Sequence, residues 1–281
     1  MTEIREYSDV EYVFDADAVR TRDLREYAAA IWERRTFVVH LVRSDLRSRG
    51  SSTALGNFWS VLDPLFQATI YYFLYSVLRS SSTSAEFLPV LLGGIFLFQL
   101  STAAFGEAGN SLKRGGGLML SSTFPRALLP MASVYKSIVS YVPSACVFAV
   151  LFPLVGGKFG AGLLVFPLLF IIQLVMNLGI ALLTASLVTL VPDAGNAIAY
   201  LVRILFFATP VIYPVSLLPD SARALVGWQP LFPLFASYQA VFSGEVPSPA
   251  LVLQAGLSAV VLFVLGVRVF LRHEHEFTSN L

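Results

Sequence analysis

Residues 41–75 read LVRSDLRSRGSSTALGNFWSVLDPLFQATIYYFLY. A basic segment with Arg43, Arg47 and Arg49 runs without a linker into a long apolar, aromatic-rich stretch. Basic residues beside an apolar run orient a membrane helix, because positive charge is retained on the cytoplasmic side. The stretch therefore predicts a first membrane span that is joined directly to a cytoplasmic segment.

The composition of the whole chain also favours a membrane protein. The 281 residues are 56% hydrophobic and only 13% charged, whereas soluble domains carry about 25% charged residues. A soluble domain with a large buried core is the alternative, but the apolar runs are too long and too many for it. The net charge of +1 gives no signal for nucleic-acid binding.

Six apolar segments have the length of membrane spans. We expect them at about residues 59–79, 88–111, 134–156, 162–190, 196–214 and 250–271. Lys and Arg concentrate before the first span, after the second and after the sixth. With no apolar signal segment in residues 1–35, this bias predicts a multi-pass protein with both termini in the cytoplasm.

The segment before the first span divides into two parts. Residues 1–22 are expected to form a mobile arm, residues 23–50 an amphipathic interfacial helix, and residues 51–281 the transmembrane domain. Apolar side chains such as Ile31 and Val42 recur at helical spacing, and basic residues lie mainly on other faces. Such a helix lies in the headgroup plane; an ordinary surface helix packed on a soluble domain is the alternative.

Two further segments predict short helices outside the spans. Residues 121–137, SSTFPRALLPMASVYKS, predict a short cytoplasmic helix at about 124–133 that exposes Phe124 and Arg126 for docking a partner; a plain linker is the alternative. Residues 215–249 are apolar but broken by prolines. They predict one or two re-entrant or interfacial helices on the outer side, since long apolar loops are uncommon.

Aromatic residues of the first span repeat on one helix face. Trp59, Phe66 and Phe73 are spaced by seven residues, which returns to nearly the same face. Such a stripe suits stacking against sugar rings; packing or lipid-facing aromatics are the alternative. Arg203 within the fifth span is costly there and is a functional candidate, unless its side chain snorkels to the interface.

Catalytic and metal-binding patterns are weak. The sequence KRGGGLML at residues 113–120 lacks the Gly-Lys-Ser/Thr ending of a phosphate-binding loop. The tail pair His273 and His275 and the single Cys146 suggest no metal cluster. We therefore expect no enzyme activity, metal or cofactor in this chain; any ATP and Mg²⁺ would be bound by another chain.

Three motifs in order resemble the membrane permease of ABC-2 type exporters, in the branch that exports polysaccharide, O-antigen and teichoic acid. They are Leu55-Gly56 with Trp59 and Pro64; Phe124-Pro125-Arg126 with Leu128-Leu129-Pro130; and Thr209–Pro214 with Leu218-Pro219, Gln229-Pro230 and Gly244. The chain departs from the family pattern at Gln229, where Asn is usual, and at Gln239, where Arg is frequent.

The resemblance implies an all-α membrane protein with six transmembrane helices, an N-terminal interfacial helix, a coupling helix and outer re-entrant helices. Two copies would pair with two ABC ATPase subunits in a bacterial plasma membrane and carry a polyprenyl-linked glycan such as O-antigen, galactan or teichoic acid. The implied ATPase-coupling residues are Arg34, Arg35, Arg43, Arg47, Phe124, Pro125 and Arg126. The implied substrate pathway comprises Trp59, Phe66, Tyr71, Tyr72, Tyr75, Arg203, Phe206 and Tyr213, and the outer gate comprises Trp228, Phe232 and Tyr238.

Three other functions compete with glycan export. An ABC-2 permease for drugs or simple lipids is the nearest alternative, and the dense aromatics of the first span favour the glycan. An intramembrane glycosyltransferase would need a carboxylate or histidine constellation that the sequence lacks. A gated channel without an ATPase would not need two cytoplasmic docking elements.

Overall fold

The structure is a computed structural model of the chain and describes residues 24–50, 58–78, 81–121 and 124–278. Every regular element within these ranges is a helix. The helices of the bundle are α3 (Trp59–Leu78), α4 (Ser81–Gly109), α7 (Leu128–Leu154), α8 (Phe166–Leu190), α9 (Ala194–Ala208) and α12 (Pro249–His273). The remaining helices are α1 (Leu24–Glu33), α2 (Arg35–Gly50), α5 (Ser111–Arg114), α6 (Gly116–Ser121), η3 (Ala161–Val165), η4 (Val215–Leu217), α10 (Asp220–Val226), α11 (Leu231–Phe242) and η5 (Glu274–Thr278).

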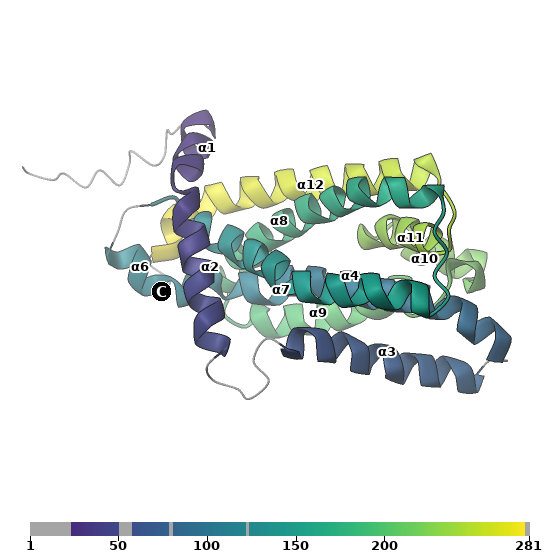
Figure 1. Cartoon of the computed structure of the whole chain (residues 1–281). Coiled ribbons are helices and arrows are strands. Elements are labelled where there is room, and N and C mark those ends of the chain that lie inside the picture. The colour runs from purple at the N-terminus through teal and green to yellow at the C-terminus, as the bar shows by residue number, and fades with distance from the viewer. Residues whose placement is uncertain (1–23, 51–57, 79–80, 122–123, 279–281) are drawn as a thin grey trace, which may run out of the picture.

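The long helices form a bundle with different elements at its two ends (Figure 1). Helix α4 packs against α3, α7, α8 and α9, and α12 packs along α8. At one end, α2 lies across the bundle close to α1, α6 and the C-terminal tail; we call this the α2 end. At the other end lie α10 and α11, and we call it the α11 end.

Four of these helical segments are long and apolar enough to cross a membrane. They are residues Phe87–Gly109, Leu128–Leu154, Ala161–Leu190 and Pro249–Phe277. Helix α3 has 20 residues but carries Asp63 and Gln67, and α9 has only 15 residues. The structure thus supports a multi-pass helical membrane protein with four candidate spans, whereas the sequence predicted six.

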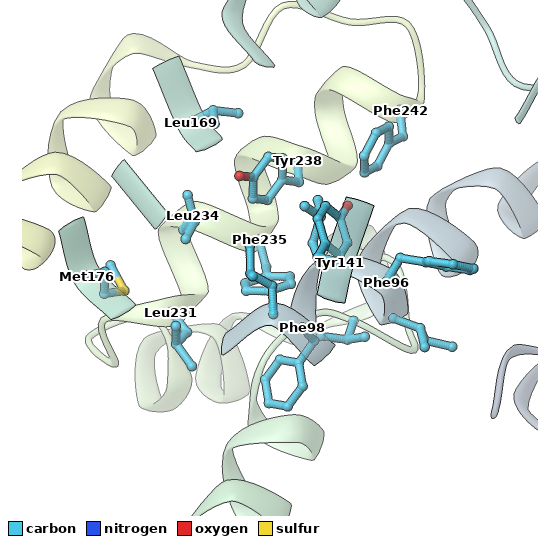
Figure 2. Close-up of a cluster of buried hydrophobic side chains, with 14 of the residues drawn as sticks. Phe96, Phe98, Tyr141, Leu169, Met176, Leu231, Leu234, Phe235, Tyr238 and Phe242 are labelled. Atoms are coloured by element: carbon cyan, nitrogen blue, oxygen red, sulfur yellow. The ribbon is translucent and has the colours of Figure 1, made fainter. Parts of the chain in front are cut away.

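Aromatic side chains fill the core toward the α11 end. Phe235, Tyr238 and Phe242 of α11 point among side chains of α4, α7 and α8 (Figure 2). The rings of Tyr238 and Phe242 stack with centroids 6.1 Å apart, and Phe98 of α4 lies 5.7 Å from Phe235. Aromatic packing of this kind adds about 0.5–1.5 kcal/mol per pair beyond area burial. The helix predicted to be re-entrant is therefore largely buried within the protomer.

Two glycines allow α8 and α12 to approach closely. A β-carbon on Gly179 would lie 2.5 Å from the backbone of Leu262, and one on Gly266 would lie 2.3 Å from the carbonyl oxygen of Gly179. No side chain fits at either distance, so the two backbones are in direct contact. Small residues at helix contacts are typical of membrane bundles, where dispersion contacts replace the hydrophobic driving force.

The N-terminal segment differs from the single helix predicted for residues 23–50. Helix α1 ends at Glu33 and α2 begins at Arg35. The guanidinium of Arg35 donates to the carbonyl oxygen of Trp32 at 2.9 Å and also lies 4.8 Å from the Trp32 ring. This contact satisfies a carbonyl at the end of α1 and favours the break. The predicted mobile arm at residues 1–22 lies outside the described residues.

Two other predicted helix boundaries also differ. Helix α9 ends at Ala208 rather than at residue 214, because Thr209 precedes Pro210 and adopts extended backbone angles. The expected separate coupling helix at 124–133 is not formed: residues 124–127 make a turn, and α7 runs without interruption from Leu128. In the region 215–249, three short helices form, η4, α10 and α11, whereas the sequence predicted one or two.

Candidate coupling site at the α2 end

Four segments that are far apart in sequence meet at the α2 end of the bundle. They are α1, α2, the turn at residues 124–127 and the C-terminal tail η5. The turn connects α6 to α7, and η5 continues directly from α12. The end of the molecule predicted to contact a partner is therefore built from both termini of the described chain and one loop.

A buried hydrogen-bond chain connects three of these segments. The hydroxyl of Tyr27 donates to Glu274 Oε1 at 2.8 Å, and the backbone N–H of Arg126 donates to the same oxygen at 3.0 Å. The N–H of Ala127 donates to the Tyr27 oxygen at 3.4 Å. The Arg126 guanidinium also donates to the Glu274 carbonyl oxygen. Burial, reinforced by the Glu274 carboxylate, raises the pKa of Tyr27 above its usual range, so Tyr27 stays a neutral donor.

An apolar cluster encloses this chain of hydrogen bonds. Phe277 is fully buried, and its ring lies 5.1 Å edge-on from Phe270. The cluster also includes Tyr27, Leu112, Met119, Ala127, Leu129, Leu182 and Ala185. Water is thus kept from the hydrogen bonds, and hydrogen bonds to a charged group are stronger when desolvated.

The two residues expected to be exposed for docking are partly enclosed instead. Phe124 is half-buried, and its ring lies 5.5 Å from that of Phe37 on α2. Arg126 is half-buried and bonded to Glu274, and Pro125 is buried. The prediction that Phe124 and Arg126 project freely is therefore wrong. They join the turn to α2 and to the tail, so a partner can reach only part of each side chain.

An ion cluster ties α2 to the bundle beside this site. Lys136 of α7 is 4% exposed, and its ammonium pairs with Asp45 of α2 and, at 3.1 Å, with Glu107 of α4. These residues border a pocket of about 290 Å³ that Ser111 and Arg114 also line. A nearly buried ammonium requires such partners, because desolvation without them costs several kcal/mol. The cluster fixes where α2 crosses α7.

The predicted basic residues lie at the break between α1 and α2 and along α2. Arg34, Arg35, Arg43 and Arg47 are all exposed. Their positions leave a positively charged face beside the turn at 124–127. No contact in the structure tests whether these residues bind a partner, and their coupling role stays a prediction.

The predicted substrate-pathway residues divide between a surface and a packed interior. Trp59 and Phe66 of α3 are 44% and 57% exposed. Tyr71 instead packs 5.5 Å from Phe206 of α9. Tyr72 and Tyr213 are half-buried, whereas Arg203 is exposed beside the Tyr200 ring, 5.7 Å away. The side chain of Tyr75 lies outside the described residues.

The three predicted gate residues do not lie together at the surface. Trp228 is 78% exposed, whereas Phe232 and Tyr238 are buried in the core. The Tyr238 hydroxyl donates to Gln173 Oε1 at 2.9 Å, and the Gln173 amide donates to Ser101 and to the carbonyl oxygen of Leu97. In this conformation Phe232 and Tyr238 hold α11 to the bundle rather than line an opening.

Sequence reasoning noted Gln229 and Gln239 only as departures from the family pattern and missed that they hold the segment after α9. The Gln239 amide donates to the carbonyl oxygens of Pro210 and Tyr213 at 2.6 and 2.7 Å and accepts from the N–H of Val215. The Gln229 amide donates to Thr209 Oγ1 at 3.0 Å. The available signal was the presence of polar side chains in proline-rich segments. Prolines there remove backbone N–H donors, so some carbonyl oxygens need a side-chain donor instead.

The helical bundle with its four candidate spans defines the class of multi-pass membrane proteins. A family model described as ABC-2 type transporter matches residues 36–243, and the chain belongs to that family. This confirms the resemblance drawn from the three motifs.

Curated relatives are similar over nearly the whole chain. The O-antigen export system permease protein RfbA of Myxococcus xanthus is 26% identical over 254 residues, which cover 89% of this chain and 97% of the relative. Two Klebsiella pneumoniae proteins of the same name are 22% and 20% identical over 250 residues, covering 87% of this chain and 94% of each relative.

Proposed function

We propose that this chain is the membrane permease subunit of an ATP-driven exporter that carries a lipid-linked polysaccharide from the cytoplasm to the outer face of a bacterial plasma membrane. The observation that carries the proposal is the end-to-end similarity to three proteins named as O-antigen export permeases. The similarity covers 87–89% of this chain and 94–97% of each relative.

The α2 end is the proposed contact with the ATPase subunits, which would bind ATP and Mg²⁺. The exposed Arg34, Arg35, Arg43 and Arg47 present positive charge there. Positive residues at a membrane end are retained in the cytoplasm, and this supports a cytoplasmic location for both termini of the permease and for its ATPases. ATP hydrolysis on the partner then displaces α2 and the turn at 124–127.

A second copy of the chain is the proposed neighbour of α3 and α9. Ile70 and Phe73 of α3 and Ile204 and Phe207 of α9 are 56–68% exposed. Both helices lie on the same side of the bundle in Figure 1. In the proposed homodimer these two helices from each copy border the glycan path, and the exposed rings of Trp59 and Phe66 offer flat apolar faces to sugar rings.

Depletion of the chain in its own cell tests the proposed function. Loss of an exporter leaves the lipid-linked glycan unable to cross, so glycan on intact cells should fall while the lipid-linked form accumulates inside. Lectin binding to intact cells and to lysates measures the two pools. An unchanged distribution of glycan, with altered efflux of a small drug or a simple lipid, would support the alternative permease function instead.

A further inference from the structure

The tail that follows α12 connects two elements that the sequence places far away. Glu274 is 4% exposed and accepts hydrogen bonds from Tyr27, 247 residues earlier, and from the backbone of Arg126, 148 residues earlier. Its carbonyl oxygen accepts a further bond from the Arg126 guanidinium. One residue of the tail is therefore bonded to both α1 and the turn at 124–127.

The position of Glu274 is itself fixed from both sides. On one side α12 packs along α8 with the direct backbone contact at Gly179 and Gly266. On the other, the buried Phe277 anchors the tail in the apolar cluster beneath the turn. Because both anchors hold Glu274 in place, its carboxylate cannot simply move along with the turn. A displacement of the turn must therefore either break the hydrogen bonds to Glu274 or move α12.

The bonds form a continuous chain from backbone to backbone. The Ala127 N–H donates to the Tyr27 oxygen, the Tyr27 hydroxyl donates to Glu274, and Glu274 also accepts from the Arg126 N–H. Both links through Tyr27 are buried, the link from the Arg126 N–H is partly buried, and the shared acceptor is charged. Breaking any one of them leaves a buried polar group without its partner, which costs more than the bond itself contributes.

We propose that Glu274 is a positioning residue for transport: it locks α1 and the turn at 124–127 to α12, so that the two docking elements and the last long helix move as one unit. This inference rests on the proposed function and adds a role for the C-terminal tail to it. Motion imposed at the turn reaches the bundle through α12 and α8, in addition to the direct route through α7, which begins at Leu128.

Hydrogen exchange tests the lock without any partner protein. In purified Glu274→Ala, the amides of Arg126, Ala127 and α1 should exchange about tenfold faster, since a bond to a charged group is lost. Exchange within α8 should stay unchanged. Glu274→Gln keeps an acceptor oxygen, so its exchange rates at Arg126, Ala127 and α1 should lie between those of the wild type and of Glu274→Ala. Glu26→Ala, which removes an exposed carboxylate from α1, is the matched control. Unchanged protection of Arg126 and Ala127 in Glu274→Ala overturns the proposal.

The amount of glycan exported per ATP hydrolysed tests the consequence for transport. Glu274→Ala should lower this ratio at least threefold while the KM for ATP and the amount of bound ATPase stay as in the wild type, and Glu274→Gln should restore most of it. A wild-type ratio in Glu274→Ala, despite faster exchange at the turn, overturns the positioning role. Failure of the wild-type chain itself to bind an ATPase or export glycan would refute the proposed function, while the exchange result would still decide whether the lock exists.

Discussion

Lys136 shows how a single side chain determines the geometry of the α2 end. Its ammonium is nearly buried and lies between carboxylates of α2 and α4. The side chains of Asp45 and Glu107 are 43% and 30% exposed. Water therefore screens part of the attraction, and the cluster is weaker than a fully buried ion pair.

Replacement of Lys136 by Met should lower the free energy of unfolding by about 2 kcal/mol. Breaking a fully buried ion pair costs ~3–5 kcal/mol, and the loss here is smaller because the carboxylates are partly hydrated. Thermal unfolding in detergent measures it. Lys158→Met, at an exposed position, is the control and should be neutral. Adding Asp45→Asn to Lys136→Met should recover part of the loss, since it removes a carboxylate that has lost its Lys136 partner. Equal melting temperatures for Lys136→Met and the wild type would exclude a stabilising cluster.

The individual residues of the candidate site were only partly predictable. Phe124, Pro125 and Arg126 were found because they form a compact motif between two spans. The pairing of Tyr27 with Glu274 was not predicted, because hydrogen bonds between residues 247 positions apart leave no local pattern. The residues beside Tyr27 on α1 are mostly exposed. The immediate neighbours of Tyr27 therefore do not indicate that this residue is buried.

At the level of helices, apolar length was a reliable predictor and exact endings were not. Each of the six expected spans corresponds to a helix, because an apolar stretch in a membrane must satisfy its own backbone. Only four of them are long and apolar enough to cross a membrane, however, and α9 has only 15 residues. The ending of α9 at Ala208 and the break at Arg34 depend instead on single residues. Pro210 determines where α9 ends, and the hydrogen-bonding Arg35 determines the break between α1 and α2. A hydropathy pattern averages over such single residues and therefore does not locate these endings.

The contact between α8 and α12 provides a test at the level of helices. Gly179→Val should push the two backbones apart, because even a β-carbon would lie 2.5 Å from Leu262. Overpacking of this kind costs about 1–3 kcal/mol or more. Fluorescence-detected gel filtration should show less monodisperse protein. Gly106→Ala, where no atom lies within 4 Å of the added carbon, is the control. A normal profile for Gly179→Val would show that the helices are farther apart than the structure has them.

For the whole molecule, the proposed homodimer predicts which outer faces meet. In a Cys146→Ser background, Ile70→Cys and Ile204→Cys, tested singly and together in native membranes, should form cross-linked dimers with a short bismaleimide. Leu253→Cys on α12 is the control: its side chain is 65% exposed, close to the 64% of Ile204. Efficient cross-linking through residue 253 but not through 70 or 204 would place the second copy on the opposite face.

The most direct test of glycan export is reconstitution of the purified permease with its ATPase in lipid vesicles. A polyprenyl-linked glycan is incorporated, and lectin binding to its outward-facing fraction is followed after ATP is added on the ATPase side. The proposed function predicts an ATP-dependent transfer of glycan to the opposite face, absent with a non-hydrolysable ATP analogue. ATP hydrolysis by the assembled complex with no transfer of glycan would contradict it.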